Sequence, residues 1–333
     1  MGTLNTTTTR MTPAPETRMT PAPERVAAGW RPARRRRFTK NSPAGEVVLA
    51  YLDANTARLT ALDLAVRREK PDAVHQMRVT ARRLRAVLQA YPTILREPDT
   101  RHLQGELKWL GGVLGEARDA EVLADNLHAG LAAVPTELVL GPAQARITIH
   151  FAPIEANARR EVLEALDSER YRELRAELGR LLDSPPLTPE AAEPAGTVLT
   201  RAVRSATRRA NRRMRRARRA PAGRPREVAV HETRKAAKRA RYAAEVAEPA
   251  LGKKRGKKAH RSVKRMKNVQ SVLGDHQDAV LARAVARDIG IQAHLAGENA
   301  FSFGLLHERA HHQALDARTQ ARRVWRRAWK SRL

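Results

Sequence analysis

Apolar residues recur along most of this chain at intervals of three and four positions, the spacing that places them on one face of an α-helix. Val48, Leu52, Leu59, Leu62 and Val66 form one such series. No segment shows the sustained alternation of apolar and polar residues that is typical of a half-buried strand. The pattern therefore predicts an all-α fold. Its helices are expected over about residues 44–70, 71–91, 99–123, 142–166, 169–182, 197–220, 257–272, 281–289 and 298–329, with one more that contains 230–241.

Prolines and glycines mark the predicted breaks between these helices. Pro71 and Pro92 bound the second helix, and the segment 221–225 separates two later ones. Gly252 and Gly256 are expected to lie in a lysine-rich loop. The helix after that loop is expected to end at the segment 273–281.

Two of the predicted helices carry the same motif, His-x-x-Arg-x-x-x-basic-Arg-x-Arg, at 75–85 and at 231–241. A second motif also occurs twice. Leu-Gly-Glu-Ala-Arg-Asp-Ala-Glu-Val-Leu at 114–123 returns, one residue shorter, as Leu-Gly-Asp-His-Gln-Asp-Ala-Val-Leu at 273–281. Because both motifs recur in the same order at nearly the same spacing, the sequence predicts an internal duplication.

The duplication suggests how the chain is divided. Residues 1–43 form a tail, with a tandem repeat at 10–25 that is too polar to bury a core and a basic run at 34–37. A first half is predicted over 44–183 and a second over 197–333, joined by the proline-containing linker 184–196. Each half is expected to pack as an antiparallel helical bundle.

Charge narrows the choice of partner. The 333-residue chain has a formal net charge of +29 at pH 7 and an isoelectric point near 11.5. In the compact state so many positive charges repel one another. The excess therefore suggests a partner that supplies negative charge, such as nucleic acid, an anionic membrane surface or free polyphosphate. Cysteine is absent, which excludes disulfides and thiolate metal sites. With no long apolar run and no signal-peptide pattern, we expect a cytoplasmic location.

The positive charge gathers on particular helix faces. On a helical projection His75, Arg78, Arg82 and Arg85 form one stripe, with apolar residues opposite. The second motif copy places its own stripe in the same way, through His231, Arg234, Lys238 and Arg241. If the two stripes face each other, their charges converge on one groove that suits a long linear polyanion. A further helix, over 197–220, is also rich in arginine.

The paired His-x-x-Arg helices, the Leu-Gly-x-x-x-Asp segments and the duplicated helical layout resemble the CHAD domain, the conserved-histidine α-helical domain. The resemblance covers about residues 44–333. It implies two four-helix bundles related by a pseudo-two-fold axis and a basic central cleft that binds inorganic polyphosphate. The ligands that it implies are His75, Arg78, Arg82, Arg83, Arg85, Lys108, His231, Arg234, Lys235, Lys238, Arg239, Arg241, Lys264 and Lys267. One departure is that Val79 stands where the second copy has Lys235.

The two motif histidines leave three roles open. They could contact phosphate in a pH-dependent way, since imidazole titrates near neutrality. They could instead be structural and bond a backbone carbonyl. A metal-ligand role is less favoured, because neither has an acidic or histidine partner three or four residues on.

Catalysis is not expected. His307-Glu308-Arg309-Ala310-His311 matches the zinc-protease pattern His-Glu-x-x-His, but no suitable third ligand follows it. Asp119 and Asp278 recur in the two halves, and an arginine-pairing or helix-start role suits them better than holding a metal. No phosphate-binding Gly-x-x-x-x-Gly-Lys-Ser/Thr loop is present in the sequence.

The sequence thus predicts a protein that binds inorganic polyphosphate without cofactors and without changing it chemically, with polyphosphate granules as one destination. Non-specific binding of nucleic acid is the alternative, since it would use the same charges. Sequence-specific readers contact base edges, and RNA binders stack bases on aromatic side chains. Neither basic stripe carries an aromatic residue, which favours a bare phosphate polymer.

Overall fold

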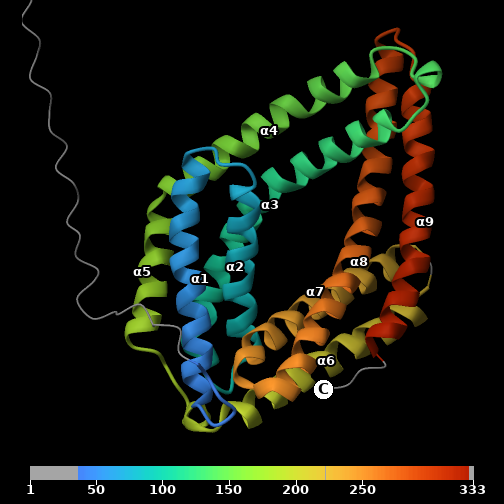
Figure 1. Cartoon of the computed structure of the whole chain (residues 1–333). Helices are drawn as coiled ribbons and strands as arrows, with labels where there is room; N and C mark the ends of the chain where they lie inside the picture. The colour runs from blue at the N-terminus through green and yellow to red at the C-terminus, as the bar shows by residue number, and fades with distance from the viewer. Residues whose placement is uncertain (1–36, 222, 330–333) are drawn as a thin grey trace, which may run out of the picture. The chain divides into compact units, whose positions relative to one another are not determined.

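The computed structural model describes residues 37–221 and 223–329, and the regular structure of these residues is helical, without a strand (Figure 1). The all-α prediction is therefore confirmed. Of the predicted tail, residues 1–36 lie outside the described residues. The α-helices of the described chain are α1 (Ala44–Arg67), α2 (Ala73–Ala90), α3 (Glu97–Ala132), α4 (Ala143–Asp167), α5 (Glu169–Asp183), α6 (Ala195–Arg219), α7 (Arg224–Ala247), α8 (Gly252–Leu295) and α9 (Phe301–Trp329). Three short 3-10 helices are η1 (Thr136–Leu138), η2 (Pro189–Ala192) and η3 (Glu248–Ala250).

Proline and glycine set several of the helix starts. Pro43 directly precedes α1 and Pro194 directly precedes α6. Both prolines have an extended backbone, and the helix begins at the next residue. Gly223 has a φ of +86°, which lets the chain reverse between α6 and α7, and Pro225 then lies in the first turn of α7. The predicted break at 221–225 is thereby confirmed.

The prediction for residues 252–295 was wrong. They form one helix of 44 residues, α8, instead of a loop followed by two shorter helices. Gly252 takes a φ of +69° where the helix begins, but Gly256 and Gly274 lie inside it. A glycine within a helix costs only about 1 kcal/mol relative to alanine, so favourable packing can outweigh it. The chain turns at Gly297, and α9 begins at Phe301.

Among the described residues, the apolar faces meet in three clusters. The largest packs α1, α2, α3 and α5 against parts of α6 and α7, with Leu52, Leu84 and Leu199 among its members. A second joins the later part of α3 and the start of α4 to α8 and α9. The third holds α6, α7, α8 and α9 together and includes Met214 and Trp325. Two of the three clusters thus draw on both of the predicted halves.

The two motif helices, α2 and α7, pack against each other (Figure 1). Their apolar faces point into the cores through residues such as Met77 and Leu84 on α2 and Ala240 on α7. At the end of α2 the buried Tyr91 hydroxyl donates to the backbone oxygen of Ala243, at 2.7 Å. This contact fixes the two helices relative to each other and so fixes their basic faces. None of the described helices has a segment that is long and apolar enough to cross a membrane.

Candidate polyanion-binding site

The first copies of the two repeated motifs lie against each other. The guanidinium group of Arg78 packs on Gly115, where an added Cβ would lie 3.3 Å from its Nη2 atom. The same guanidinium donates to Asp119 Oδ1, at 2.8 Å. The glycine therefore makes room for the arginine, and the aspartate four residues later orients it. The arginine-pairing role predicted for Asp119 is confirmed.

The second copy of the two motifs has the same glycine contact but a different polar one. Arg234 packs on Gly274, where a Cβ would lie 3.0 Å from its Nη2 atom. Its Nη1 atom lies 3.4 Å from Gln277 Oε1, which is also 3.3 Å from Nδ1 of His231. Burial lowers the pKa of Arg234, and the negative charge of Asp278 opposes this effect. The second arginine is thus held mainly by a neutral amide.

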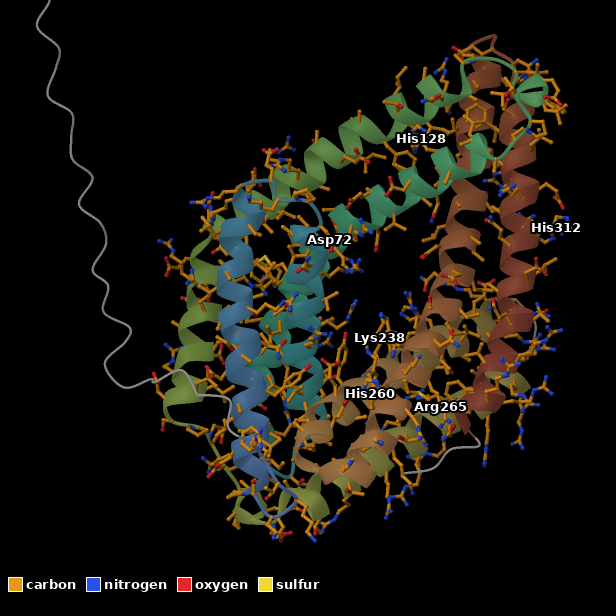
Figure 2. All side chains as sticks on the ribbon, in the orientation of Figure 1. Asp72, His128, Lys238, His260, Arg265 and His312 are labelled. Atoms are coloured by element: carbon orange, nitrogen blue, oxygen red, sulfur yellow. The ribbon has the colours of Figure 1, made fainter. Side chains whose placement is uncertain are left out.

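Side chains from both motif helices gather between α2 and α7. We call Arg78, Arg82, Arg234 and Lys238 the central cluster. Arg82 Nε donates to the hydroxyl of Tyr242, at 3.1 Å, and so reaches across from α2 to α7. Lys238, labelled in Figure 2, belongs to α7. Burial and neighbouring positive charges together lower the pKa of its amine to about 7, with burial the largest cause. The positive charges that contribute to this shift are, in decreasing order, those of Arg234, Arg82, Arg78 and Arg241.

Several donors around the central cluster are buried and have no acceptor among the described residues. They are the Nε atoms of Arg85, Arg234 and Arg241; the Nδ1 atom of His75, a donor in one of its protonation states, is buried without a partner as well. Buried polar groups in proteins nearly always have hydrogen-bond partners, and a donor left without one is costly. Acceptor oxygens of a bound anion would satisfy these groups.

The motif histidines have different surroundings. His75 is half-buried, and burial lowers its pKa. The charge of Asp72 opposes this effect, whereas those of Arg118, Arg82 and Arg78 add to it. His231 is exposed and contacts Gln277. Neither histidine bonds a backbone carbonyl within the described part of the chain, so the structural role that the sequence left open is not observed. The described residues also contain no group of three or more His, Asp or Glu that could hold a metal ion.

The structure places the other predicted ligands outside the central cluster. Arg83 lies 3.3 Å from Glu245, a carboxylate that also accepts a 2.9 Å hydrogen bond from Tyr51. Lys235 and Arg239 lie on the side of α7 that faces α6. Three exposed lysines make no ion pair or hydrogen bond with any described residue: Lys108, Lys264 and Lys267.

Sequence reasoning missed two residues beside the cluster. The charge of Arg118 acts on His75, so this arginine of α3 lies near the first motif. The Leu-Gly-x-x-x-Asp segment itself contained the signal, because Arg118 directly precedes Asp119. Tyr242 had no such signal, since its partner Arg82 lies 160 residues away in the sequence.

The zinc-protease pattern on α9 does not form a metal site in the described structure. His307 Nδ1 lies 3.0 Å from the backbone oxygen of Arg283, and Nε2 lies 3.0 Å from the Nε donor of the same arginine. Both ring nitrogens are therefore occupied. Glu308, the acidic residue of the pattern, lies 3.1 Å from His312, which is on the outer side of α9 (Figure 2).

The fold and the site define an all-helical protein whose two motif helices gather cations between them. The chain belongs to the CHAD domain family, whose model matches residues 50–287. It is 34% identical over 266 residues to the uncharacterized proteins MT2285 and Rv2226 from two strains of Mycobacterium tuberculosis, a match that covers 80% of this chain. The chain spans about half the length of these curated relatives, of which 50% is covered.

Two solved structures share the fold. PptA from Streptomyces chartreusis superposes with a TM-score of 0.69 at 23% identity, covering 86% of this chain and 100% of that one. The CHAD domain from the plant Ricinus communis superposes with a TM-score of 0.67 at 24% identity, covering 90% and 96%. At this level of identity the likeness concerns the fold alone.

Proposed function

We propose that this protein binds inorganic polyphosphate at the central cluster between α2 and α7. The observation that carries the proposal is the convergence of cations from both motif helices on Lys238, whose pKa is held near 7 by burial and by its positive neighbours. Crowding of like charges is unfavourable unless a ligand neutralises them. The resemblance of the motifs to the CHAD family, in which this binding is implied, points to the same ligand.

The chemistry of the cluster suits a phosphate chain. Each phosphate unit offers several acceptor oxygens, and arginine can donate to two of them at once. The buried Nε donors of Arg234 and Arg241 would then gain acceptors. A bound anion would also favour the protonated form of Lys238, so that binding would take up a proton at pH values above about 7.

We further propose that the protein holds the polymer without cleaving or extending it. The side chains of the cluster are hydrogen-bond donors, and two carboxylates act on them: Asp119 is bonded by Arg78, and the charge of Asp278 acts on Arg234. Binding of this kind would serve to bring the protein to polyphosphate granules. Polyphosphate incubated with the protein should keep its length distribution on a gel; progressive shortening would show an activity.

Nucleic acid remains the second candidate, because a net charge of +29 attracts any polyanion. Single-stranded nucleic acid is usually held by stacking of its bases on aromatic side chains. Tyr242, the aromatic residue at the cluster, is fully buried and offers only its hydroxyl. This favours a polymer without bases.

A competition titration separates the two candidates. Labelled long-chain polyphosphate is bound to the protein at physiological salt and displaced with unlabelled polyphosphate, duplex DNA or RNA at matched phosphate concentration. We expect polyphosphate to compete best. Stronger competition by either nucleic acid would reject polyphosphate as the preferred ligand.

A further inference from the structure

A second group of cations lines a groove between α6 and α7. The groove has a volume of about 340 Å³. Its walls carry six cationic side chains, four from α6 and two from α7: Arg209, Arg212, Arg213, Arg216, Lys235 and Arg239. We call it the α6–α7 groove. The arginine-rich helix that the sequence singled out therefore faces part of the second motif.

Helical spacing explains why this groove is so basic. The four arginines of α6 follow the spacing i, i+3, i+4 and i+7, which places them on one face. A neighbouring face of the same helix carries Ala210, Met214 and Ala217, which are buried. Packing of that apolar face into the core holds the arginine stripe beside α7. The position of the groove thus follows from the core.

The groove has a large excess of positive charge. Its one carboxylate, Glu232, bonds Lys235 at 3.0 Å. That bond lowers the pKa of Glu232, so the carboxylate stays ionised. Among the described residues, none forms an ion pair with the four arginines of the stripe. Arginines that lie this close without acidic partners favour an anion from outside the chain.

The groove leads toward the central cluster. Because α6 and α7 are antiparallel neighbours, Arg209 and Arg239 lie at one end and Arg216 lies toward the other. Burial lowers the pKa of Arg85 of α2, and the charge of Arg239 adds to this effect, so the two guanidinium groups lie near each other. Arg85 in turn belongs to the basic stripe of α2 that contains Arg82. A series of cationic side chains therefore links the α6–α7 groove to the central cluster.

The lining of the groove selects a class of ligand. Apart from charged residues it contains Ala236, and no aromatic side chain of the described residues lines it. It therefore lacks the stacking surface that nucleic-acid bases use. We propose that the α6–α7 groove is a second binding site for polyphosphate, entered by a chain that the central cluster already holds. This inference rests on the proposed function.

Two linked sites predict a dependence on chain length. Once one part of a polymer is bound, the next part reaches the second site at high effective concentration. A long chain gains from this effect, whereas a chain of three phosphates occupies each site separately. Long polyphosphate should therefore bind about a hundredfold or more tighter than tripolyphosphate.

The test compares two triple variants of α6 that remove the same charge. The groove variant is Arg209→Gln, Arg213→Gln and Arg216→Gln. The control is Arg204→Gln, Arg208→Gln and Arg219→Gln, which changes exposed arginines that do not line the groove. Glutamine has a helix propensity close to that of arginine, so helicity by circular dichroism should stay at the wild-type value in both.

Isothermal titration gives the readout. We expect wild type and control to bind two tripolyphosphate ions, and the groove variant to bind one with unchanged affinity. For long chains, the groove variant should lose about tenfold or more in affinity relative to the control. Equal affinities of the two variants for long chains, or two ions bound by the groove variant, would overturn the second site.

The same titration distinguishes this failure from failure of the proposed function. If polyphosphate binds the wild type and neutralising the central cluster abolishes binding, but the groove variant matches the control, only the groove proposal is wrong. If the wild type does not bind polyphosphate, or the central-cluster variant binds as tightly as wild type, the proposed function itself is wrong.

Discussion

The two basic regions of this molecule differ in how their cations are held. In the central cluster each arginine is fixed by a neighbour: Arg78 by Asp119 and Gly115, Arg82 by Tyr242, and Arg234 by Gly274 and Gln277. In the α6–α7 groove, most arginines are exposed and have no carboxylate partner among the described residues. Fixed, half-buried cations lose little entropy when they bind, and they act in a low dielectric. We therefore expect the cluster to supply affinity and the groove to add to it for long chains.

Removing the central cluster should have the largest effect. Each hydrogen bond to a charged group contributes about 1.5–3 kcal/mol, so losing several predicts a loss of about a hundredfold or more. The variant carries Arg78→Gln, Arg82→Gln, Arg234→Gln and Lys238→Gln, and its polyphosphate affinity is measured by titration calorimetry. A variant that changes four exposed α6 arginines to glutamine, at 204, 208, 218 and 219, serves as the control for net charge. If the cluster variant binds polyphosphate within about threefold of this control, the central cluster is not the main source of affinity.

Protonation of Lys238 should produce the next largest effect. With its pKa near 7, this amine is mostly neutral at pH 8 and mostly charged at pH 6. Polyphosphate affinity should therefore rise as the pH falls across this window, by up to about tenfold for the lysine alone. Lys238→Met should flatten the profile between pH 6 and 8. His75 could also make binding depend on pH, but burial lowers its pKa. A pH dependence caused by His75 would still be present in the Lys238→Met variant.

The glycine contacts offer a more delicate test of how the cluster is held. Gly274→Ala should stabilise α8 by up to about 1 kcal/mol, since alanine favours helix. It should nevertheless weaken polyphosphate binding, because the new Cβ would lie 3.0 Å from Nη2 of Arg234 and would displace it. Thermal unfolding and binding are measured on the same sample. Gly111→Ala is the matched control, since its Cβ would meet nothing within 4 Å. Equal binding by both variants would show that the guanidinium tolerates displacement.

Arg83 should show the smallest effect on binding. It pairs with Glu245, which also bonds Tyr51, so the structure gives it a role in holding α1, α2 and α7 together. Arg83→Gln is expected to lower the free energy of unfolding by about 1 kcal/mol and to change polyphosphate affinity less than about twofold. Denaturant unfolding and titration report the two effects separately. A loss of affinity like that of an Arg82→Gln variant would place Arg83 in the binding site after all.

The helical pattern predicted much of this molecule because burial on one face repeats so regularly. It predicted α2 and α7 as amphipathic helices with one basic face each, but it did not decide whether those faces would meet. It failed at α8, where Gly252, Gly256 and Gly274 suggested breaks. Whether a glycine breaks a helix depends on its tertiary neighbour, and that of Gly274 is a guanidinium from another helix.

Part of the site was predicted from the same regular helical spacing. Helical spacing grouped Arg234 with Lys238, and both lie in the central cluster. It could not decide the surroundings of Lys235 and Arg239, which depend on where α6 packs. The cross-contact between Arg82 and Tyr242 likewise needs the fold, because no local pattern joins two residues so far apart in the chain.

A crystal structure of the protein with bound polyphosphate would test the central claim most directly. The account predicts phosphate oxygens within about 3 Å of Nζ of Lys238 and of the guanidinium groups of Arg82 and Arg234. With long chains, density should continue past Arg85 and Arg239 into the α6–α7 groove. Polyphosphate bound only at other basic surfaces, with the space between α2 and α7 holding none, would contradict the account.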